Sequence, residues 1–257
     1  MIRHGRNATQ VGAMALLLAV PLAAGQYAFT GVTGWYQSLD VFGLAFLSPV
    51  EGLESLLLTG SIWVPLLWAL LPTLLVVLLL GRVFCSWVCP VNLLQEMTDR
   101  SMCRPRARPD HVTLPRSTIL WVLAAELAAA LAAGVPLFCF WSPPALVGRE
   151  IFMAVFFRTV AIEGALIVVI LLLNLFTARF FCRHLCPLGG MLALLGRWRR
   201  LRVRHAPDRC TACGQCDPVC PMGIRPAAGE SQSMWCWNCG ECVDACGDSA
   251  LSFTVKK

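Results

Sequence analysis

Eight cysteines near the C-terminus have the spacing of iron–sulfur cluster ligands. They form two runs, and in each run the first cysteine is followed by others three, six and ten residues later. A cubane cluster needs four converging thiolates; one short loop supplies three, and in two-cluster bacterial ferredoxins the fourth comes from the other run. The spacing predicts two [4Fe-4S] clusters, the first held by Cys210, Cys213, Cys216 and Cys246 and the second by Cys236, Cys239, Cys242 and Cys220.

Two other uses of these cysteines fit the pattern less well. Structural zinc sites favour paired C-x2-C units over two quartets of this spacing. A disulfide framework needs an oxidising compartment, whereas the orientation argued below puts these residues on the reducing side. The second run has Gly247 where the first has Pro221, and this difference leaves the number of ligands unchanged.

Four further cysteines occur as two matched pairs in the motif Phe-Cys-x3-Cys-Pro. The pairs are Cys85 with Cys89 and Cys182 with Cys186, offset by 97 residues. A Ser-Pro sequence in the preceding loop also repeats, so the chain predicts a duplicated helix pair with both copies in the same orientation. Cysteines four residues apart share one helix face, and the proline after each pair ends that helix.

Packing of the two copies about a common axis would bring these four thiolates together. Their role is open: they could hold a third cluster, bind another metal or relay electrons as two redox dithiols. The alternative is that they are structural thiols at a helix end.

The rest of the chain predicts a membrane domain. Of the 257 residues 57% are hydrophobic and 14% are charged, with a mean hydropathy of +0.67. A helix of about 20 apolar residues spans a bilayer, and four stretches fit, Val11–Phe29, Ile62–Leu80, Thr118–Phe140 and Thr159–Ala178. We therefore expect an all-α domain of four transmembrane helices over residues 1–196, a basic linker over 197–209, and a small α+β ferredoxin-like domain with two [4Fe-4S] clusters over 210–257.

The placement of arginine predicts an orientation. Arginines precede the first stretch and follow the second and fourth, whereas residues 31–61 contain no Lys or Arg. By the positive-inside rule, we expect a bacterial inner-membrane protein whose termini and ferredoxin domain are cytoplasmic. The net charge of +6 is mostly this topology signal and does not indicate nucleic-acid binding.

One carboxylate inside a predicted span is a candidate for proton transfer. Glu126 lies near the middle of the third stretch. Ionisable residues in such positions are functional candidates by default, so Glu126 could accept a proton from a bound quinol. The alternative is a buried acid that is hydrogen-bonded to a neighbouring helix.

The motifs together resemble the NapH/MauN family of ferredoxin-type membrane proteins. The resemblance rests on the run from Phe84 to Pro90, on the second Cys-x3-Cys-Pro motif and on the two C-terminal cysteine runs, and it covers nearly the whole chain. It implies a membrane component of a quinol dehydrogenase, in contact with lipid and quinol. This component would pass electrons to a NapG-like polyferredoxin or a multihaem cytochrome, and on to a periplasmic reductase such as nitrate reductase. We expect an electron-transfer subunit rather than a stand-alone enzyme.

The direction of electron flow is open at this point. Quinol is a mild reductant, whereas iron–sulfur potentials span about −700 to +450 mV. Low-potential clusters would favour a second role, in which a MauN- or NosR-like maturation or reactivation factor delivers electrons to a periplasmic metalloenzyme. A third possibility is a docking subunit with mainly structural clusters.

Overall fold

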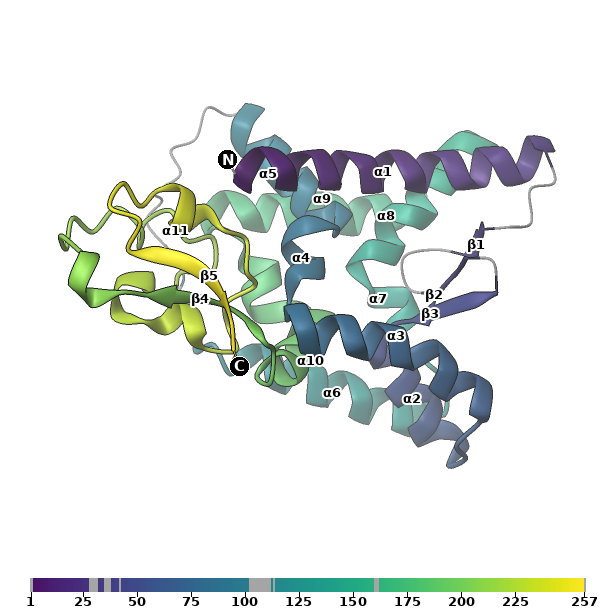
Figure 1. The fold of residues 1–257 in the computed structure, drawn as a ribbon. Coiled ribbons are helices and arrows are strands. Elements are labelled where there is room, and N and C mark those ends of the chain that lie inside the picture. The colour runs from purple at the N-terminus through teal and green to yellow at the C-terminus, as the bar shows by residue number, and fades with distance from the viewer. Residues whose placement is uncertain are drawn as a thin grey trace.

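The chain folds into a helical part and a smaller C-terminal unit that lie side by side (Figure 1). The computed structural model describes residues 2–27, 32–34, 38–41, 43–101, 112, 114–159 and 162–256. The longer helices are α1 (Ile2–Tyr27), α2 (Pro49–Thr59), α3 (Val64–Leu80), α5 (Pro90–Ser101), α6 (Thr118–Ala133), α8 (Pro143–Phe152), α9 (Ile162–Phe176) and α10 (Pro187–Gly196). The short helices are α4 (Val83–Trp87), α7 (Phe138–Trp141), α11 (Glu241–Asp244), the π-helices η1 (Met153–Phe157) and η2 (Phe181–Leu185), and the 3-10 turns η3 (Pro207–Arg209), η4 (Pro226–Ala228) and η5 (Glu230–Gln232).

Two small antiparallel sheets complete the fold. In the first, β1 (Val32–Gly34), β2 (Ser38–Val41) and β3 (Leu44–Leu47) pair in sequence order. In the second, β4 (Leu201–His205) pairs with β5 (Leu251–Val255). The second sheet ties the two ends of the C-terminal unit together, and β4 lies within residues 197–209, the segment predicted as a linker.

The helix lengths correct the predicted membrane domain. The most apolar helices, α3, α6 and α9, have 17, 16 and 15 residues. At about 1.5 Å per residue they fall short of a hydrocarbon core of about 30 Å. Helix α1 has 26 residues but is much less apolar on average. Within the described residues no helix combines the length and the apolar character needed to cross a bilayer. The predictions of four transmembrane helices and of an inner-membrane location are therefore wrong.

Local sequence explains why the helices are shorter than the hydrophobic stretches. The stretch predicted over Thr118–Phe140 is divided at Gly134, which takes a left-handed φ of 69° and ends α6. Pro136 follows, and α7 begins only at Phe138. A glycine in this conformation is a common helix C-terminus, and a nearby proline prevents continuation. Mean hydropathy over a window does not register either signal.

The order of elements repeats in the two halves of the helical part. Each half has a helix that begins with proline (α2, α8), an apolar helix (α3, α9), a five-residue helix with the first cysteine of a pair (α4, η2), and a second helix that begins with proline (α5, α10). Proline favours the first helical position because its fixed φ suits a helix and its missing N–H would be unpaired there anyway. The repeated Ser-Pro and Cys-Pro sequences therefore set the same helix starts twice.

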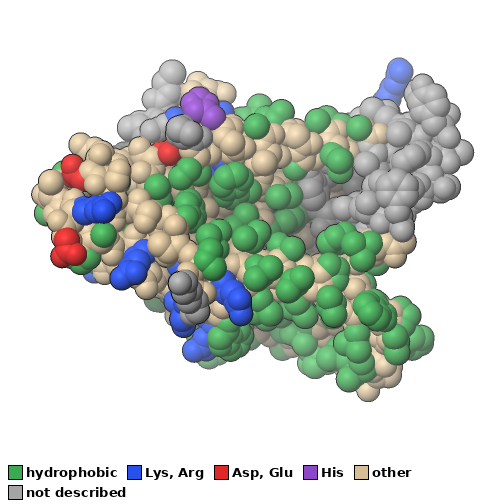
Figure 2. Space-filling view, in the orientation of Figure 1, with side chains coloured by type: hydrophobic (Ala, Val, Ile, Leu, Met, Phe, Trp, Pro, Cys, Tyr) green, Lys and Arg blue, Asp and Glu red, His purple; other side chains and the backbone are tan. Residues whose placement is uncertain are grey.

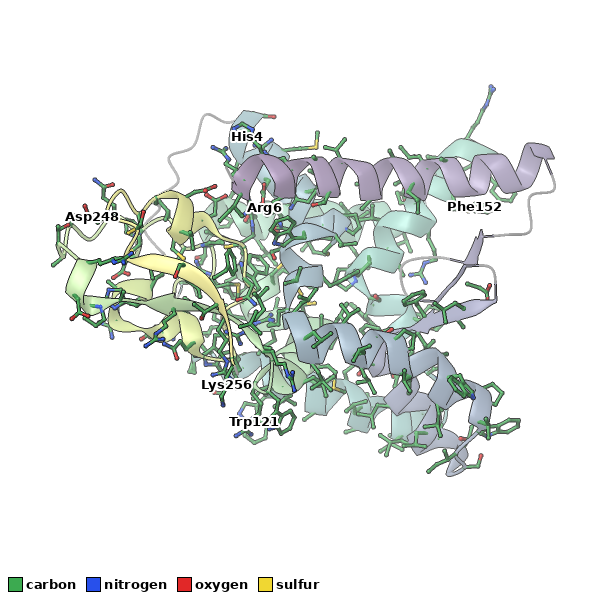
Figure 3. All side chains as sticks on the ribbon, viewed as in Figure 1. His4, Arg6, Trp121, Phe152, Asp248 and Lys256 are labelled. Atoms are coloured by element: carbon green, nitrogen blue, oxygen red, sulfur yellow. The ribbon has the colours of Figure 1, made fainter. Side chains whose placement is uncertain are left out.

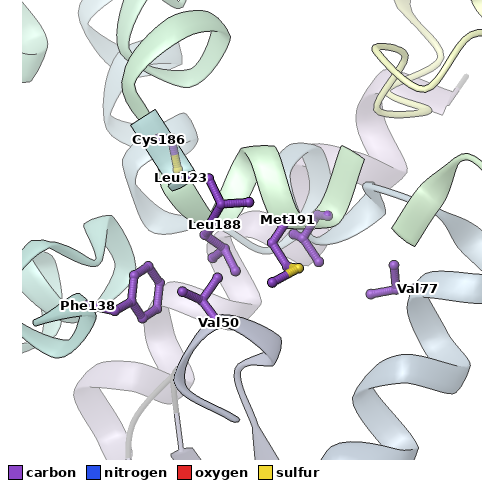
Figure 4. Close-up of a cluster of buried hydrophobic side chains, with 8 residues drawn as sticks. Val50, Val77, Leu123, Phe138, Cys186, Leu188 and Met191 are labelled. Atoms are coloured by element: carbon purple, nitrogen blue, oxygen red, sulfur yellow. The ribbon is translucent and has the colours of Figure 1, made fainter. Parts of the chain in front are cut away.

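The core of the helical part forms around α10. Cys186, Leu188, Met191 and Leu192 pack with side chains from four other helices, namely Val50, Val77, Leu123 and Phe138 (Figure 4). Because α10 begins at a cysteine pair, one member of that pair is fixed within the hydrophobic core. A different surface forms over α3, where hydrophobic side chains are exposed over much of one face (Figure 2), among them Trp68, Leu71 and Leu75.

Candidate iron–sulfur site

The cysteines of the predicted second cluster surround one cavity. Cys220, Cys236, Cys239 and Cys242, called here the inner set, all line it together with Trp237. Cys236, Cys239 and Cys242 are each only 7% exposed. The loop between Cys236 and Cys239 turns at Asn238, whose φ is 57° and whose side-chain amide donates to the carbonyl oxygens of Leu80 and Leu201. The structure thus brings the inner set together and anchors its loop to the helical part.

The cysteines of the predicted first cluster, called here the outer set, lie nearer the surface. Cys216 and Cys246 both pack against the hydrophobic cluster that contains Cys242 of the inner set. Cys210 follows the turn η3, and Cys213 is exposed on the next loop. The outer set therefore presents one side to solvent, while its other side contacts the inner set.

The two Cys-x3-Cys pairs meet at a second cavity. Cys85, Cys89, Cys182 and Cys186, called here the tetrad, all line it. The expected continuous helix through each pair is absent, and both motifs end in the same wider turn. The N–H of Cys89 donates to the carbonyl of Phe84 at 2.9 Å, and that of Cys186 to the carbonyl of Phe181 at 3.0 Å. Hydrogen bonds between an N–H and the carbonyl five residues earlier are typical of π-turns, which are frequent at functional sites.

The second cysteine of each pair lies at the start of the next helix. The Cys186 sulfur accepts a hydrogen bond from the N–H of Gly189 at 3.3 Å, and the Cys89 sulfur accepts from the N–H of Asn92, also three residues later. A helix N-terminus stabilises negative charge. Burial nevertheless raises the pKa of all four thiols, and that of Cys182 to about 12. Metal or cluster binding at the tetrad therefore has to displace protons.

The three cysteine sets form a continuous series of contacts. Cys85 and Cys182 of the tetrad pack in the same hydrophobic cluster as Cys220, Cys236 and Cys239 of the inner set. Trp237 lines both the tetrad cavity and the inner cavity and is 2% exposed. Its indole Nε1 has no hydrogen-bond partner within the part of the chain that the structure describes. Since the inner set also contacts the outer set, the order in space is tetrad, inner set, outer set.

Two buried arginines lie beside these cysteines without a carboxylate partner. Arg82 is 1% exposed, lines the tetrad cavity, and donates from Nη1 to the carbonyl of Trp235 at 3.4 Å. Arg199 is 0% exposed and donates from Nη2 to the carbonyl of Ser231, which lines the inner cavity, at 3.0 Å. Among the ion pairs of the described residues, none involves Arg82 or Arg199. Arg199 also packs across Gly81, where a Cβ atom would collide with its side chain.

The buried nitrogen atoms of these arginines that lack hydrogen-bond partners indicate whether the site suits an iron–sulfur cluster. Nε and Nη2 of Arg82 and Nε of Arg199 are buried and have no hydrogen-bond partner among the described residues. Burying an unpaired charge costs several kcal/mol, so the arrangement requires an anion nearby. A [4Fe-4S] cluster with four thiolate ligands has a net negative charge, because the thiolates outweigh the charge of the core. The cysteines and arginines together therefore suit such clusters.

A third buried arginine connects α1 to the inner set. Arg6 lies near the start of α1, beside the C-terminal unit (Figure 3). It forms ion pairs with Glu241 at 2.6 Å and with Glu96 at 3.1 Å, and its Nη1 contacts the carbonyl of Cys239 at 3.5 Å. Unlike Arg82 and Arg199, Arg6 is neutralised by carboxylates of the protein.

Glu126 lies outside both cysteine cavities. It is beside Glu54 of α2, which is 1% exposed and accepts hydrogen bonds from the N–H groups of Leu137 and Phe138, each at 3.2 Å. Burial and the neighbouring Glu54 raise the pKa of Glu126 to about 8. Burial and Glu54 also raise the pKa of Glu51, to about 6. The sequence singled out Glu126 within its own hydrophobic stretch, and the structure adds one acidic neighbour from α2, Glu54, which in turn interacts with Glu51.

Sequence reasoning about the cysteines missed Arg82, Arg199 and Trp237. One signal was available, because Arg82 and Arg179 show the same offset of 97 residues as the cysteine pairs. As for a single metal ion, no three His, Cys, Asp or Glu side chains of the described residues are arranged to hold one.

Comparison with known proteins agrees with this chemistry. A family described as a 4Fe-4S binding domain matches residues 61–108 and 160–204, the two segments that contain the tetrad. The methylamine utilization ferredoxin-type protein MauN of Methylorubrum extorquens is 33% identical, with 86% of this chain and 76% of that protein covered. MauN of Paracoccus denitrificans is 32% identical, with 84% and 74% covered. No solved structure matches the chain.

A second group of similar proteins carries the name NapH. The ferredoxin-type protein NapH of Escherichia coli is 30% identical, with 77% of this chain and 68% of that protein covered. The resemblance predicted from the motifs is thereby confirmed. The chain belongs to the MauN and NapH family of ferredoxin-type iron–sulfur electron-transfer proteins.

Proposed function

We propose that this protein takes electrons from a quinol and passes them through three iron–sulfur centres to a partner protein. The inner and outer sets would each hold a [4Fe-4S] cluster, and the tetrad would hold a third. Such clusters supply one-electron storage when bound. The observation that carries this proposal is the series of contacts from the tetrad through the inner set to the outer set, with Trp237 lining both of the first two cavities.

The difference in burial between the three cysteine sets supports different roles for them in electron transfer. Burial of the tetrad and the inner set excludes water from the first two positions of the series. The exposed side of the outer set, at Cys213, gives a partner protein access. A polyferredoxin of the NapG type or a multihaem cytochrome would dock there as part of a quinol dehydrogenase that serves a periplasmic reductase. The chain would then act as an electron-transfer subunit.

The arginines near the inner set support quinol as the donor. Reduction adds one negative charge to a cluster, and a buried cation stabilises that charge because screening inside a protein is weak. Within the described residues, Arg82 and Arg199 have no carboxylate that offsets them. Their effect is to raise the reduction potential, which brings a cluster closer to the range of a mild reductant.

Oxidation of a quinol to a quinone releases two electrons and two protons, so protons need an acceptor. Glu126 is the candidate for this role. A carboxyl group whose pKa is raised to about 8 takes up and releases a proton near neutral pH. The neighbouring Glu54 supplies a second oxygen pair through which a proton can be shared.

An anaerobic titration tests the donor. The purified protein with its iron intact is mixed with a reduced quinol analogue, and cluster reduction is followed by EPR. New reduced-cluster signals at a modest quinol excess are expected. Signals that arise only with dithionite would reject quinol as the donor and favour the maturation or reactivation role, in which a stronger reductant supplies electrons.

Iron content tests the three sets. The wild-type protein should hold about twelve iron atoms, and Cys85→Ser should hold about eight because the tetrad loses its cluster. Cys139→Ser is the matched control, since Cys139 belongs to none of the three sets. Equal iron in Cys85→Ser and Cys139→Ser would reject a cluster at the tetrad.

A further inference from the structure

Equivalent arginines in the two repeats have different partners. Arg82 and Arg179 each lie three residues before the first cysteine of a pair, and both are buried. Arg179 forms an ion pair with Asp99 at 2.9 Å and contacts Glu96 at 4.0 Å. Arg82 has no such partner among the described residues and leaves two nitrogens unpaired. The repeat therefore supplies two similar cations, and in the described part of the chain carboxylates pair with Arg179 but not with Arg82.

Arg82 lies between two of the cysteine sets. It lines the tetrad cavity with Cys85 and Cys182, and its Nη1 donates to the carbonyl of Trp235, the residue before Cys236. Arg82 is thus close to both the tetrad and the inner set.

Arg199, unlike Arg82, lies beside the inner set alone. Its guanidinium is bonded to Ser231 in the wall of the inner cavity, and it does not line the tetrad cavity. Burial lowers the pKa of Arg199 itself, and the nearby positive charges of Arg202 and Arg82 contribute in the same direction. Two like charges buried together need negative charge close by.

We propose that Arg82 and Arg199 are the buried counter-charges that raise the reduction potentials of these centres, Arg82 at both the tetrad and the inner set and Arg199 at the inner set alone. This rests on the proposed clusters. A [4Fe-4S] cluster with four thiolates changes from a net charge of about −2 to about −3 when it gains one electron, and no bond forms or breaks. A fixed cation favours the more negative state, and its burial keeps salt from screening it.

The test is a potentiometric titration followed by EPR. The samples are the wild-type protein, Arg82→Gln and Arg199→Gln. The signal lost in Cys85→Ser is assigned to the tetrad, the signal lost in Cys213→Ser to the outer set, and the remaining signal to the inner set. Arg82→Gln is expected to lower the midpoint potentials of the tetrad and inner signals, and Arg199→Gln that of the inner signal only. Neither should move the outer signal, and the shifts should persist at high salt. Arg200→Gln is the matched control, because Arg200 is the exposed neighbour of Arg199 and should shift nothing.

Conservative variants cover the case in which a glutamine variant fails to hold iron. The substitutions Arg82→Lys and Arg199→Lys keep the positive charge at a similar side-chain size. Retention of iron and potential in the lysine variants, with loss in the glutamine variants, supports a counter-charge role. Equal loss of iron or potential in the lysine and glutamine variants would overturn the counter-charge role and indicate a packing role. Glutamine variants with wild-type potentials would also overturn the counter-charge role. A wild-type protein without cluster signals would instead refute the proposed function.

Discussion

Ser86 and Arg183 occupy the same position in the two repeats, and each donates a hydrogen bond to the backbone that carries the inner set. The Ser86 hydroxyl lies 2.8 Å from the carbonyl oxygen of Trp237, and the Arg183 Nε lies 2.9 Å from that of Pro221. Trp237 follows Cys236, and Pro221 follows Cys220. Each repeat therefore holds one side of the inner set against the tetrad.

This relationship predicts that Ser86→Ala weakens the inner site. Ser86 is 1% exposed, and its removal leaves a buried carbonyl with one partner fewer, at a cost of about 1–3 kcal/mol. We expect a lower denaturant midpoint and faster loss of iron to a chelator. Ser101→Ala is the control, because Ser101 is exposed and donates only to the carbonyl of Met97 in its own helix. Equal rates of iron loss in both variants would contradict the role of Ser86 in holding the inner set.

The chemistry of the site could be predicted from the sequence because cysteine spacing is local information. The repeated motif also indicated that Cys85, Cys89, Cys182 and Cys186 would converge, and all four line one cavity. Helix lengths could not be predicted from hydropathy, since Gly134 ends α6 inside a continuous apolar stretch. The family resemblance could be predicted because it depends on those same motifs.

The environment of the cysteines depends on long-range packing, which a single sequence does not reveal. Arg82 and Arg179 look alike in the sequence, yet only Arg179 reaches Asp99. Arg199 belongs to a run of arginines that indicates a basic linker, and its burial follows from packing across Gly81. Charge patterns alone therefore do not separate a solvated arginine from one that is buried beside a cysteine.

Arg6 should be a major link between α1 and the C-terminal unit. Its side chain is 4% exposed and pairs with Glu241 and Glu96. Arg6→Met therefore leaves the largely buried Glu241 without this cation, while Glu96 keeps Arg100 and the more distant Arg179. Breaking a buried pair in this way costs about 3–5 kcal/mol. Chemical denaturation of the iron-loaded protein measures the loss.

Arg100→Met is the matched control for Arg6. Arg100 pairs with the same Glu96 at 3.4 Å, but its side chain is 45% exposed. An exposed pair contributes about 0–1 kcal/mol. Losses of equal size in the two variants would show that burial of Arg6 has no special effect.

Trp237 should matter as the wall shared by the tetrad and inner cavities. Trp237→Ala removes a fully buried side chain and should cost about 3–5 kcal/mol, because the surroundings do not fill the space. Trp237→Phe keeps most of the packing and removes only part of the ring system with its indole N–H, so the expected loss is smaller. Thermal unfolding and the rate of quinol reduction of the inner centre measure both effects. Trp198→Ala is the control, since Trp198 is 63% exposed, and a loss as large as that of Trp237→Ala would argue against the shared wall.

Glu126 gives the protein a pH-dependent stability. Burial and Glu54 raise its pKa from an ordinary 4.5 to about 8, so between these values the folded protein holds a proton that the unfolded chain has released. Stability therefore falls as pH rises through this window and levels off above it. Glu126→Gln removes the effect, and the variant should gain stability over the wild type as pH rises from about 5 to about 9.

The gain should be about 1 kcal/mol, or about 2–4 °C in Tm, because the partly solvated side chain is screened and the full shift does not apply. Thermal unfolding at several pH values measures it. Asp208→Asn is the control, since it removes an exposed acid in the turn η3 and leaves Glu126 in place. A Tm difference between Glu126→Gln and the wild type that stays constant across this pH range would show that Glu126 is an ordinary surface acid, and would also remove it as a proton acceptor for quinol.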